Sequence, residues 1–326
     1  MYGSDMKISI AHQNSYGTAV TAASSFMAIP VLGETFANEK PVLEVNNMRG
    51  VYDAQTPKEG PNSVSGGMEA EANPISLGNL LKTVLDTPTS TKANSASVYT
   101  HVFLPNSVDF DRFAANRPVT ILKDFADGSS GDLMYDMIGS SLALSIANGE
   151  LLKISTEFMG GKQGMKAAVS STFEDVARAF TWDTTSVSLG GVAVEEILDL
   201  SVTIDCALTN RHTLNASKEP SRTKRDGLRS VAVEGNILFE TMSHYLAFKN
   251  RTEQNLKLHL VGTGSEISSG YNDALTIECP SFTFDEFKPN ASGPGMIEVP
   301  LKGRSTYNVG SGHSVKVTLV NTATAY

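Results

Sequence analysis

The feature that most constrains this chain is an internal repeat. An alternating stretch of apolar and polar residues leads twice, at a constant offset, into a short helical pattern. A chain that repeats a structural unit is more typical of a building block with two similar halves than of a single catalytic pocket. The matched positions are Gly66, Met68, Ala70, Glu71 and Leu77 in the first copy and Gly235, Ile237, Phe239, Glu240 and Leu246 in the second.

The length fits two units. A chain of 326 residues is long enough for about two ordinary domains, each with its own core. With 40% hydrophobic and 19% charged residues, the composition is that of a globular protein. The glycine-rich segment Gly160–Gly164 is the best boundary, so we expect a first domain over residues 1–163 and a second over residues 164–326.

Most of the secondary structure is expected to be antiparallel strand. The clearest segment runs from Leu198 to Cys206, where apolar and polar residues alternate, so one face is buried and the other wetted. The dipeptides Asn148-Gly149 and Gly190-Gly191 separate similar stretches and readily supply the positive φ angles of tight hairpin turns.

Helices are expected in only two places. In the first, Asn73 is a candidate cap, Pro74 suits the first helical position, and apolar residues follow with helical spacing to Leu85. In the second, Thr241 is the candidate cap of a shorter helix, in which Met242, Tyr245 and Leu246 are expected to face inward. After the helices, Leu142–Ile146 resembles Leu275–Cys279, and the spacing between these two segments is smaller than the spacing of the repeat before the helices. The first half is therefore expected to contain extra loop residues.

Charge and cysteine usage exclude several classes. A net charge of −9 argues against binding nucleic acid by neutralising phosphates. The first residues lack a signal-peptide pattern, and no apolar run approaches the roughly 20 residues of a membrane span, so we expect neither secretion by signal peptide nor membrane insertion. Cys206 and Cys279 lie in similar strand contexts, which leaves their proximity open, and we expect reduced, buried thiols.

Chemical motifs are mostly absent. The sequence has no Gly-x-Ser-x-Gly elbow, no complete dinucleotide-binding glycine loop and no phosphate-binding Gly-Lys-Ser/Thr. Six histidines are scattered without the spacing of a local metal site. The carboxylate doublets Glu195-Glu196 and Asp285-Glu286 point to opposite faces if they lie on strands. We therefore expect no catalytic residues, no cofactor-binding residues and no metal.

One segment, from Arg211 to Arg229, has a local charge of +4. Pro220, Ser221 and Gly227 predict a loop there. It is either a solvated loop or a surface that docks onto an acidic neighbouring copy, with Arg222, Lys224 and Arg225 as the candidate intersubunit residues. Nucleic-acid contact is a third alternative, which the lack of interleaved aromatic residues disfavours.

A series of short motifs, in order along nearly the whole chain, resembles the bacteriophage major tail tube proteins. The motifs of the first half are Asn14–Thr18, Asn47–Gly50, Ser63–Gly66 with the Glu71 strand and the Leu77 helix, Tyr99–Pro105, and Met137–Gly139 through the Asn148-Gly149 hairpin to Glu157–Gly160. Those of the second half are Phe180–Asp183, Leu200–Asp205, Arg211–Leu214 and Glu219–Arg222.

The resemblance implies a mainly β fold, with two tandem β-sandwich or partial-barrel domains of the tail-tube type, each flanked by one α-helix. It also implies a structural virion protein without enzymatic activity. Copies would polymerise into stacked rings, and the inner sheets would join into a continuous barrel that removes exposed strand edges. The implied partners are a tape-measure protein, a tail terminator and tip proteins. The implied place is the virion tail, assembled in the host cytoplasm.

Within such a barrel, the strand from Leu198 to Cys206 suits the inner wall. Its apolar face would pack beneath the helix, and its polar face would line the lumen, where an acidic, hydroxyl-rich wall repels phosphates and lets DNA slide past without specific binding. The candidate lumen-lining residues are Asp199, Ser201, Thr203 and Asp205.

Two alternatives remain. A secreted carbohydrate-binding or carbohydrate-active β-sandwich protein is disfavoured by the single Trp182 and by the missing carboxylate pair. The inner tube of a contractile injection machine shares the tube architecture. The repeat favours a non-contractile tail but does not decide between the two kinds of tail. If single-domain relatives build six-fold rings, a chain with two such domains fills the same ring with three copies.

Overall fold

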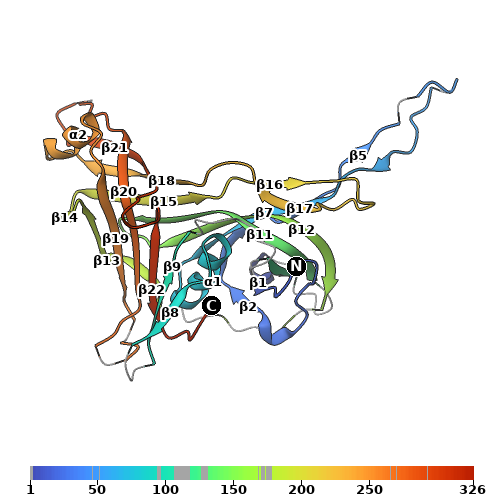
Figure 1. Cartoon of the computed structure of the whole chain (residues 1–326), viewed down its shortest axis with the longest axis horizontal. Coiled ribbons are helices and arrows are strands. Elements are labelled where there is room, and N and C mark those ends of the chain that lie inside the picture. The colour runs from blue at the N-terminus through green and yellow to red at the C-terminus, as the bar shows by residue number, and fades with distance from the viewer. Residues whose placement is uncertain are drawn as a thin grey trace.

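The chain folds mainly into antiparallel β-strands, as the computed structural model shows (Figure 1). The structure describes residues 3–45, 47–50, 52–93, 97–105, 118–125, 131–167, 169, 173, 178–264, 266–268, 270–291 and 293–326. Among these residues, eighteen strands form one continuous sheet and four more form two short ribbons. Two α-helices accompany them, so the expected mainly β class with a helix in each half is confirmed.

The strands of the first half lie side by side in a defined order. Neighbouring strands pair in antiparallel fashion, and the last position is shared by two short strands on one edge of their neighbour. The order across the sheet is β2 (Met27–Ile29), β1 (Lys7–His12), β10 (Val119–Asp124), β11 (Gly131–Ala147), β12 (Lys153–Lys166), β7 (Ser63–Glu71), and then β3 (Val31–Glu34) with β4 (Ala37–Glu39).

The second half repeats this order. Across its sheet lie β14 (Val192–Val194), β13 (Phe180–Leu189), β19 (Gln254–Gly262), β20 (Ala274–Glu286), β21 (Glu298–Ser305), β18 (Ser230–Leu238) and β15 (Ile197–Asp205). The connections match as well, because α1 (Pro74–Val84) follows β7 and α2 (Met242–Lys249) follows β18. Each strand in the first-half order therefore has an equivalent strand in the second-half order.

Irregularities in the strand pairing recur at equivalent places. A β-bulge adds one residue to one strand of a pair, and bulges are features of a fold rather than local defects. Three register shifts of the first half each have an equivalent in the second. The shift at Val31/Gly33 (β3–β7) matches that at Ile197/Asp199 (β15–β18), and the shift at Val119/Ile121 (β10–β11) matches that at Gln254/Leu256 (β19–β20). The shift at Gly139/Ser141 (β11–β12) matches that at Phe284/Glu286 (β20–β21).

These shifts correct the alignment of the repeat read from the sequence. Val31 pairs with Ala70 and its equivalent Ile197 pairs with Ile237, so the equivalent of Ile237 is Ala70 and not Met68. The sequence match was displaced by two residues, which is one full period of a β-strand. Such a slip keeps every side chain on the same face, so the alternation of apolar and polar residues does not reveal it. The match of Leu142 with Leu275 is wrong: Met137 and Phe282 are equivalent, so Leu142 corresponds to Phe287.

The two halves are joined within a single sheet. Residues Ser141–Ala147 of β11 pair with Asp205–Asp199 of β15. A second connection is made by β9 (Tyr99–Phe103), which pairs with β8 (Thr89–Lys92) and with β22 (Lys316–Asn321), and β22 in turn pairs with β20. The boundary expected after residue 163 lies inside β12, and the division into two domains stays a prediction.

The two helices differ in how far they are buried. Helix α1 lies beneath the long strands β11 and β12 (Figure 1), and Leu77, Leu80, Leu81 and Val84 are buried there as their spacing predicts. Helix α2 packs on β20, and Ala247 is its one buried residue. The expectation that Met242 and Leu246 face inward is wrong, since they are 54% and 47% exposed, whereas Tyr245 is half-buried. Asn73 and Thr241 occupy the expected cap positions, but neither side chain makes a capping hydrogen bond.

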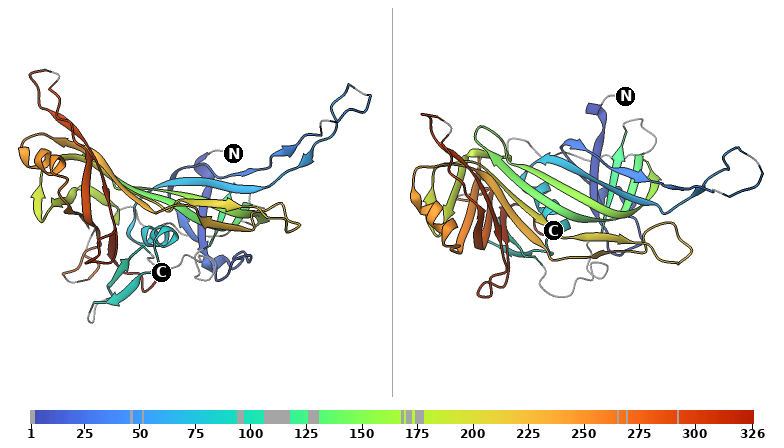
Figure 2. Two further views of the ribbon diagram at one scale, coloured as in Figure 1. Left: turned by 45° about the horizontal axis from the view of Figure 1, so that its top comes forward. Right: turned by 90° about the horizontal axis from the view of Figure 1, so that it is seen from above.

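Two hairpin arms occupy equivalent positions. The first arm, residues 40–62, connects β4 to β7 and contains β5 (Val42–Leu43) and β6 (Lys58–Glu59). It extends beyond the body of the sheet in both views of Figure 2. The second arm, residues 206–229, connects β15 to β18 and contains β16 (Leu208–Arg211) and β17 (Arg222–Arg225). The loop expected from Arg211 to Arg229 is thus partly a β-ribbon.

Other local expectations are met. Gly149 (φ 82°), Gly190 (60°) and Gly191 (83°) have the positive φ angles expected in the two hairpin turns. Both cysteines are free and buried, and burial raises the pKa of Cys279 to about 12. No helix within the described ranges is both long and apolar enough to cross a membrane.

Candidate channel face and intersubunit surfaces

Strand β15 has the alternation that the sequence predicts. Leu200, Val202 and Ile204 are each 1% exposed, since they pack into the core. On the other face Asp199, Ser201 and Thr203 are half-buried and Asp205 is exposed. The four candidate lumen residues therefore share one polar face of the sheet, and their position in a channel stays a prediction.

This polar face continues across six neighbouring strands from both halves. Residues directly opposite each other in a ladder lie on the same face, so the pairing traces complete rows from one edge to the other. One row is Glu71, Lys153, Ser145, Ser201, Glu234 and Lys302. The next is Glu69, Ser155, Ala143, Thr203, Ala232 and Arg304. Shorter rows contain Gly67, Glu157, Ser141, Asp205 and Ser230, and then Ala147, Asp199, Asn236 and Pro300.

The rows define an acidic, hydroxyl-rich surface. They contain six carboxylates and three cations, a net charge of −3. Two of the cations are paired: Lys153 Nζ lies 2.8 Å from Glu150 Oε2, and Arg304 Nη2 lies 2.8 Å from Asp285 Oδ1. Ser, Ala and Thr occupy the centre of the two long rows, where β11 pairs with β15, so short side chains line the middle of the face. Such a surface repels phosphate groups.

Two of the carboxylates have structural partners. Asn236 Nδ2 donates a hydrogen bond of 2.8 Å to Asp199 Oδ2. The Ala207 N–H donates one of 2.8 Å to Asp205 Oδ1, at a residue with a positive φ of 49°. Asp205 therefore also stabilises the turn into the second arm.

The second arm carries the candidate intersubunit residues. Arg222 and Lys224 are exposed and Arg225 is half-buried, while Thr223 between them is buried and donates a 2.8 Å hydrogen bond to Asn210. Arg211, Arg222 and Lys224 line a shallow hollow of about 700 Å³ together with His212. The structure thus gathers three cations at one exposed place.

Contacts along its length fix the second arm to the first half. The Asn62 N–H donates a 2.7 Å hydrogen bond to Lys218 O, the Lys218 ammonium pairs with Glu59, and His212 Nε2 lies 3.1 Å from Asn62 O. The exposed ion pair between Arg211 and Asp226 (2.8 Å) links its two strands.

A buried polar cluster, which the sequence patterns did not predict, anchors the same arm. Asp136 is fully buried, and its Oδ1 accepts hydrogen bonds from Gln13 Nε2 (2.9 Å) and the Gly17 N–H (2.7 Å). Lys162 Nζ lies 3.6 Å from Asp136 Oδ2 and 3.8 Å from Glu219 Oε2 on the arm. The motif Asn14–Thr18 therefore meets the motif Glu219–Arg222.

Packing around the cluster is tight. Burial, Asp136 and Glu219 together raise the pKa of Tyr16 to about 12, and its hydroxyl donates a 3.4 Å hydrogen bond to Pro220 O. Gly160 has a positive φ of 109°, and a Cβ there would lie 2.9 Å from both Asp136 O and Thr223 Oγ1. Glycine at this position allows the arm to approach the sheet, which is a structural reason for part of the Gly160–Gly164 motif.

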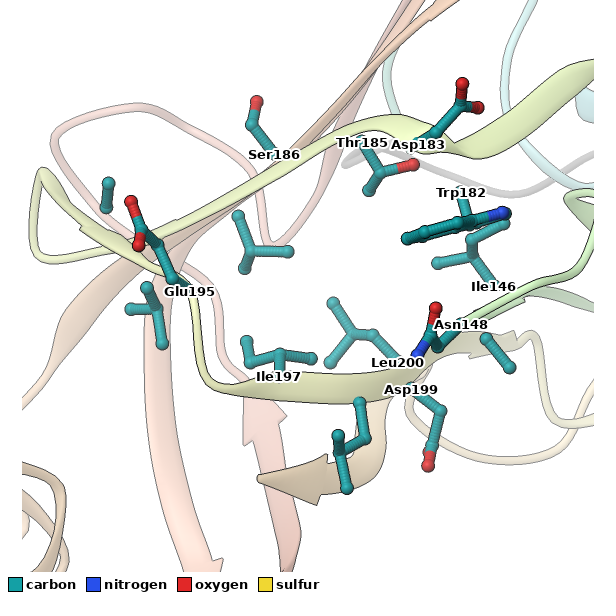
Figure 3. A pocket seen from close by; sticks show the side chains of 15 residues that line it. Ile146, Asn148, Trp182, Asp183, Thr185, Ser186, Glu195, Ile197, Asp199 and Leu200 are labelled. Atoms are coloured by element: carbon teal, nitrogen blue, oxygen red, sulfur yellow. The ribbon is translucent and has the colours of Figure 1, made fainter. Parts of the chain in front are cut away.

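A cleft of about 510 Å³ opens beside the joint between the halves, between β13–β14 and the start of β15 (Figure 3). Ile146, Ile197 and Leu200 form much of its floor, and Asp183 and Glu195 lie toward its rim. Within its lining, Trp182 is the one aromatic side chain among the described residues. Sugar-binding sites usually stack rings on aromatic side chains, so the cleft gives little support to a carbohydrate site. No group of side chains in the described part of the chain could hold a metal ion.

Together, the acidic face on a continuous sheet, the projecting arms and the repeated unit define a structural building block. The family model for the phage tail tube protein matches residues 3–305, so this chain belongs to the phage tail tube family. The family is one of structural proteins of the virion tail. The comparison with curated proteins gives no match.

Proposed function

We propose that this tail tube protein polymerises into stacked rings and that the resulting tube conducts the phage genome. The observation that supports this most is the continuous row structure of the polar face, which runs from β7 through both halves to β21 without a break. In a closed ring this face forms the inner wall, with Asp199, Ser201, Thr203 and Asp205 at its centre. Its net negative charge lets DNA pass without binding.

The proposed ring contains three copies. Each copy contributes two units with the same strand order, so three copies supply six units in an alternating, pseudo-six-fold arrangement. Rings stack through the arms, and the basic hollow of Arg211, Arg222 and Lys224 meets acidic side chains of the next ring. A tape-measure protein inside the growing tube, a terminator and tip proteins at its ends complete the proposed assembly in the host cytoplasm.

Electron microscopy of the purified chain in negative stain tests the proposal. Rings or striated tubes with an open centre are the expected result, either spontaneously at high concentration or after addition of tail tip complexes. A chain that stays monomeric under both conditions contradicts the proposed polymerisation. Glycan-array binding by that monomer would instead support the carbohydrate alternative.

A further inference from the structure

The joint between the two halves is a direct example of how one unit binds the next. Residues 141–147 of β11 pair with residues 205–199 of β15, and the ladder extends at both ends: the Cys206 N–H donates to Ser140 O (2.8 Å) and the Asn148 N–H donates to Leu198 O (3.0 Å). Helix α1 lies below this joint, where Cys206 Sγ is 3.8 Å from Val84 O. We call this contact the internal joint.

Each side of the internal joint has an equivalent elsewhere in the same chain. The bulge at Ile197/Asp199 matches that at Val31/Gly33, so β15 corresponds to β3 and β4, and Asp205 corresponds to Glu39. The bulge at Gly139/Ser141 matches that at Phe284/Glu286, so Ser141 corresponds to Glu286 and the rest of β11 to the residues after it.

Both equivalent segments have an open edge. Among the described residues, β3 and β4 pair with β7 alone, so their outer edge has no strand partner. Beyond Glu286, which pairs with Lys302 of β21, residues 287–291 belong to no described strand. An open edge presents unpaired backbone groups, which another chain can complete.

In these two segments buried and exposed side chains already alternate, as they do in paired strands. Phe287 is 1% exposed whereas Lys288 and Asn290 are exposed. On the other edge, Phe36 is 7% exposed whereas Ala37 and Glu39 are exposed. Both segments therefore turn the same alternate side chains inward as the strands of the internal joint, as a shared sheet requires.

Helix α2 provides a second sign of a missing neighbour. Its Met242 and Leu246 are 54% and 47% exposed, whereas the corresponding helix α1 is buried below the internal joint. The second unit therefore has the strand edge and the helix of a joint, but the described part of the chain does not supply the other side.

From these equivalences we infer that residues 286–291 of one copy pair antiparallel with residues 39–34 of the next copy, in the register of the internal joint. This inference rests on the proposed ring. Glu286 lies opposite Glu39, Lys288 opposite Ala37 and Asn290 opposite Thr35, with Lys288 diagonal to Glu39. Three internal joints and three of these chain-to-chain joints then close one ring.

Pro289 makes the hydrogen bonding of the chain-to-chain joint differ from that of the internal joint. Its equivalent Leu144 lies at a position whose N–H faces β15, because the hydrogen-bonded pairs on either side include Ser140 with Cys206 and Asn148 with Leu198. Pro289 has no N–H, so the joint between copies lacks one ladder hydrogen bond. Proline on an open edge also disfavours uncontrolled pairing before assembly.

Cysteine pairs test the register directly. Ala37 and Lys288 form a non-hydrogen-bonded pair, in which the Cα atoms lie about 4.5 Å apart and a disulfide fits. Tubes of Ala37→Cys/Lys288→Cys should yield covalent dimers and trimers after mild oxidation. The matched control is Ala143→Cys/Thr203→Cys, the same pair in the internal joint, which should give a bond within one chain and no dimers.

Further controls fix the interpretation. Each single cysteine variant should give no ladder of dimers and trimers, and the shifted pair Ala37→Cys/Glu286→Cys should react severalfold less. Rings that form but give no bond between chains, or a shifted pair that reacts better, overturn the joint while leaving the proposed function intact. A wild-type chain that forms no rings overturns the proposed function itself.

Hydrogen exchange of wild-type tubes covers the case in which the cysteine variants fail to assemble. In the proposed register the amides of Glu34, Phe36, Asn38, Phe287 and Ala291 face the joint. They should become at least tenfold better protected in tubes than in the unassembled chain, whereas those of β15 should already be protected in both. Unchanged exchange in residues 34–39 overturns the joint.

Discussion

At the scale of single residues, the two faces of β15 predict opposite outcomes of substitution. Val202→Asp places a carboxylate in the core beneath the sheet, where Val202 is 1% exposed. An unpaired buried charge costs several kcal/mol, so we expect no soluble folded protein. Thr203→Asp, one residue along on the polar face, should fold with a circular dichroism spectrum and melting temperature close to those of the wild type. Equal behaviour of the two variants contradicts the assignment of the faces.

Reversing the charge of carboxylates on the polar face should slow the passage of DNA through the tube but leave the tube intact. We choose Asp199→Lys with Glu234→Lys, because the Asp205 carboxylate also accepts the Ala207 N–H. Each lysine pair recurs in every ring, so the wall attracts phosphates rather than repelling them. Particles carrying the variant should show full-length tails and slowed or stalled DNA ejection, and Asp199→Asn/Glu234→Gln should fall between. Normal ejection from well-formed variant tails contradicts the placement of this face in the channel.

His12 predicts a pH dependence of folding. Burial, helped by the ammonium of Lys82, lowers the pKa of His12 to about 4. The unfolded chain, with a pKa near 6.5, binds a proton below that pH, whereas folded His12 stays neutral down to about pH 4. Stability contributed by His12 is therefore present above pH 6.5 and is lost as the pH falls, by up to about 3 kcal/mol near pH 4.

Urea denaturation of the unassembled chain at pH 7, 5 and 4 measures this effect. Other histidines with lowered pKa values, such as His101 and His259, also destabilise the fold in acid, so the comparison is with His12→Gln. The variant should lose clearly less stability between pH 7 and pH 4 than the wild type does. Parallel pH profiles for the two proteins contradict a neutral buried His12.

At the scale of elements, the second arm is expected to link rings. Arg222→Ser with Lys224→Ser removes two exposed cations from the basic hollow without touching the buried Thr223. Tubes of the variant should be shorter at low salt, and their length should respond less to added salt, because exposed charge pairs are screened within about 10 Å at 0.1 M. Lys7→Ser with Lys92→Ser makes the same charge change on exposed side chains elsewhere and should leave tube length unchanged. Tube lengths that do not distinguish the two variants contradict the role of the arm.

The elements also show what the sequence could predict. Alternation in β15, the glycine turns after β11 and β13, and the apolar spacing of α1 are local patterns, and all three were predicted correctly. Pairing between distant strands, such as β11 with β15 or β9 with β22, has no local signature, because either edge of a strand offers the same backbone groups. The alignment of the repeat was displaced for a related reason, since period-two alternation fits equally well after a slip of one full period.

The candidate site was predictable to a similar degree. The polar residues of β15 follow from alternation, and the basic character of the second arm follows from its charge. The cluster around Asp136 does not, because Gln13, Lys162 and Glu219 come from three distant segments that meet in the folded chain alone. The one sequence signal that could have indicated this cluster is a lone Asp in an apolar stretch, as in Tyr135-Asp136-Met137.

At the scale of the whole molecule, the repeat predicts the stoichiometry of the ring. Native mass spectrometry of isolated rings should give about three times the 34.8 kDa mass of the chain. The physical reason is that both halves have the same strand order and the same three register shifts, so each occupies one of six similar places. A ring of six full-length chains contradicts the prediction.

The internal joint also has a consequence for the kinetics of assembly. Because β11 and β15 belong to one polypeptide, half of the contacts in the proposed ring form during folding, at an effective concentration set by the chain rather than by the solution. Ring closure then requires encounters among three molecules instead of six, and each avoided encounter avoids a loss of translational and rotational freedom. The rate of ring nucleation should therefore rise with a lower power of protein concentration than in a tube built from single units, which favours rapid initiation when the chain is scarce.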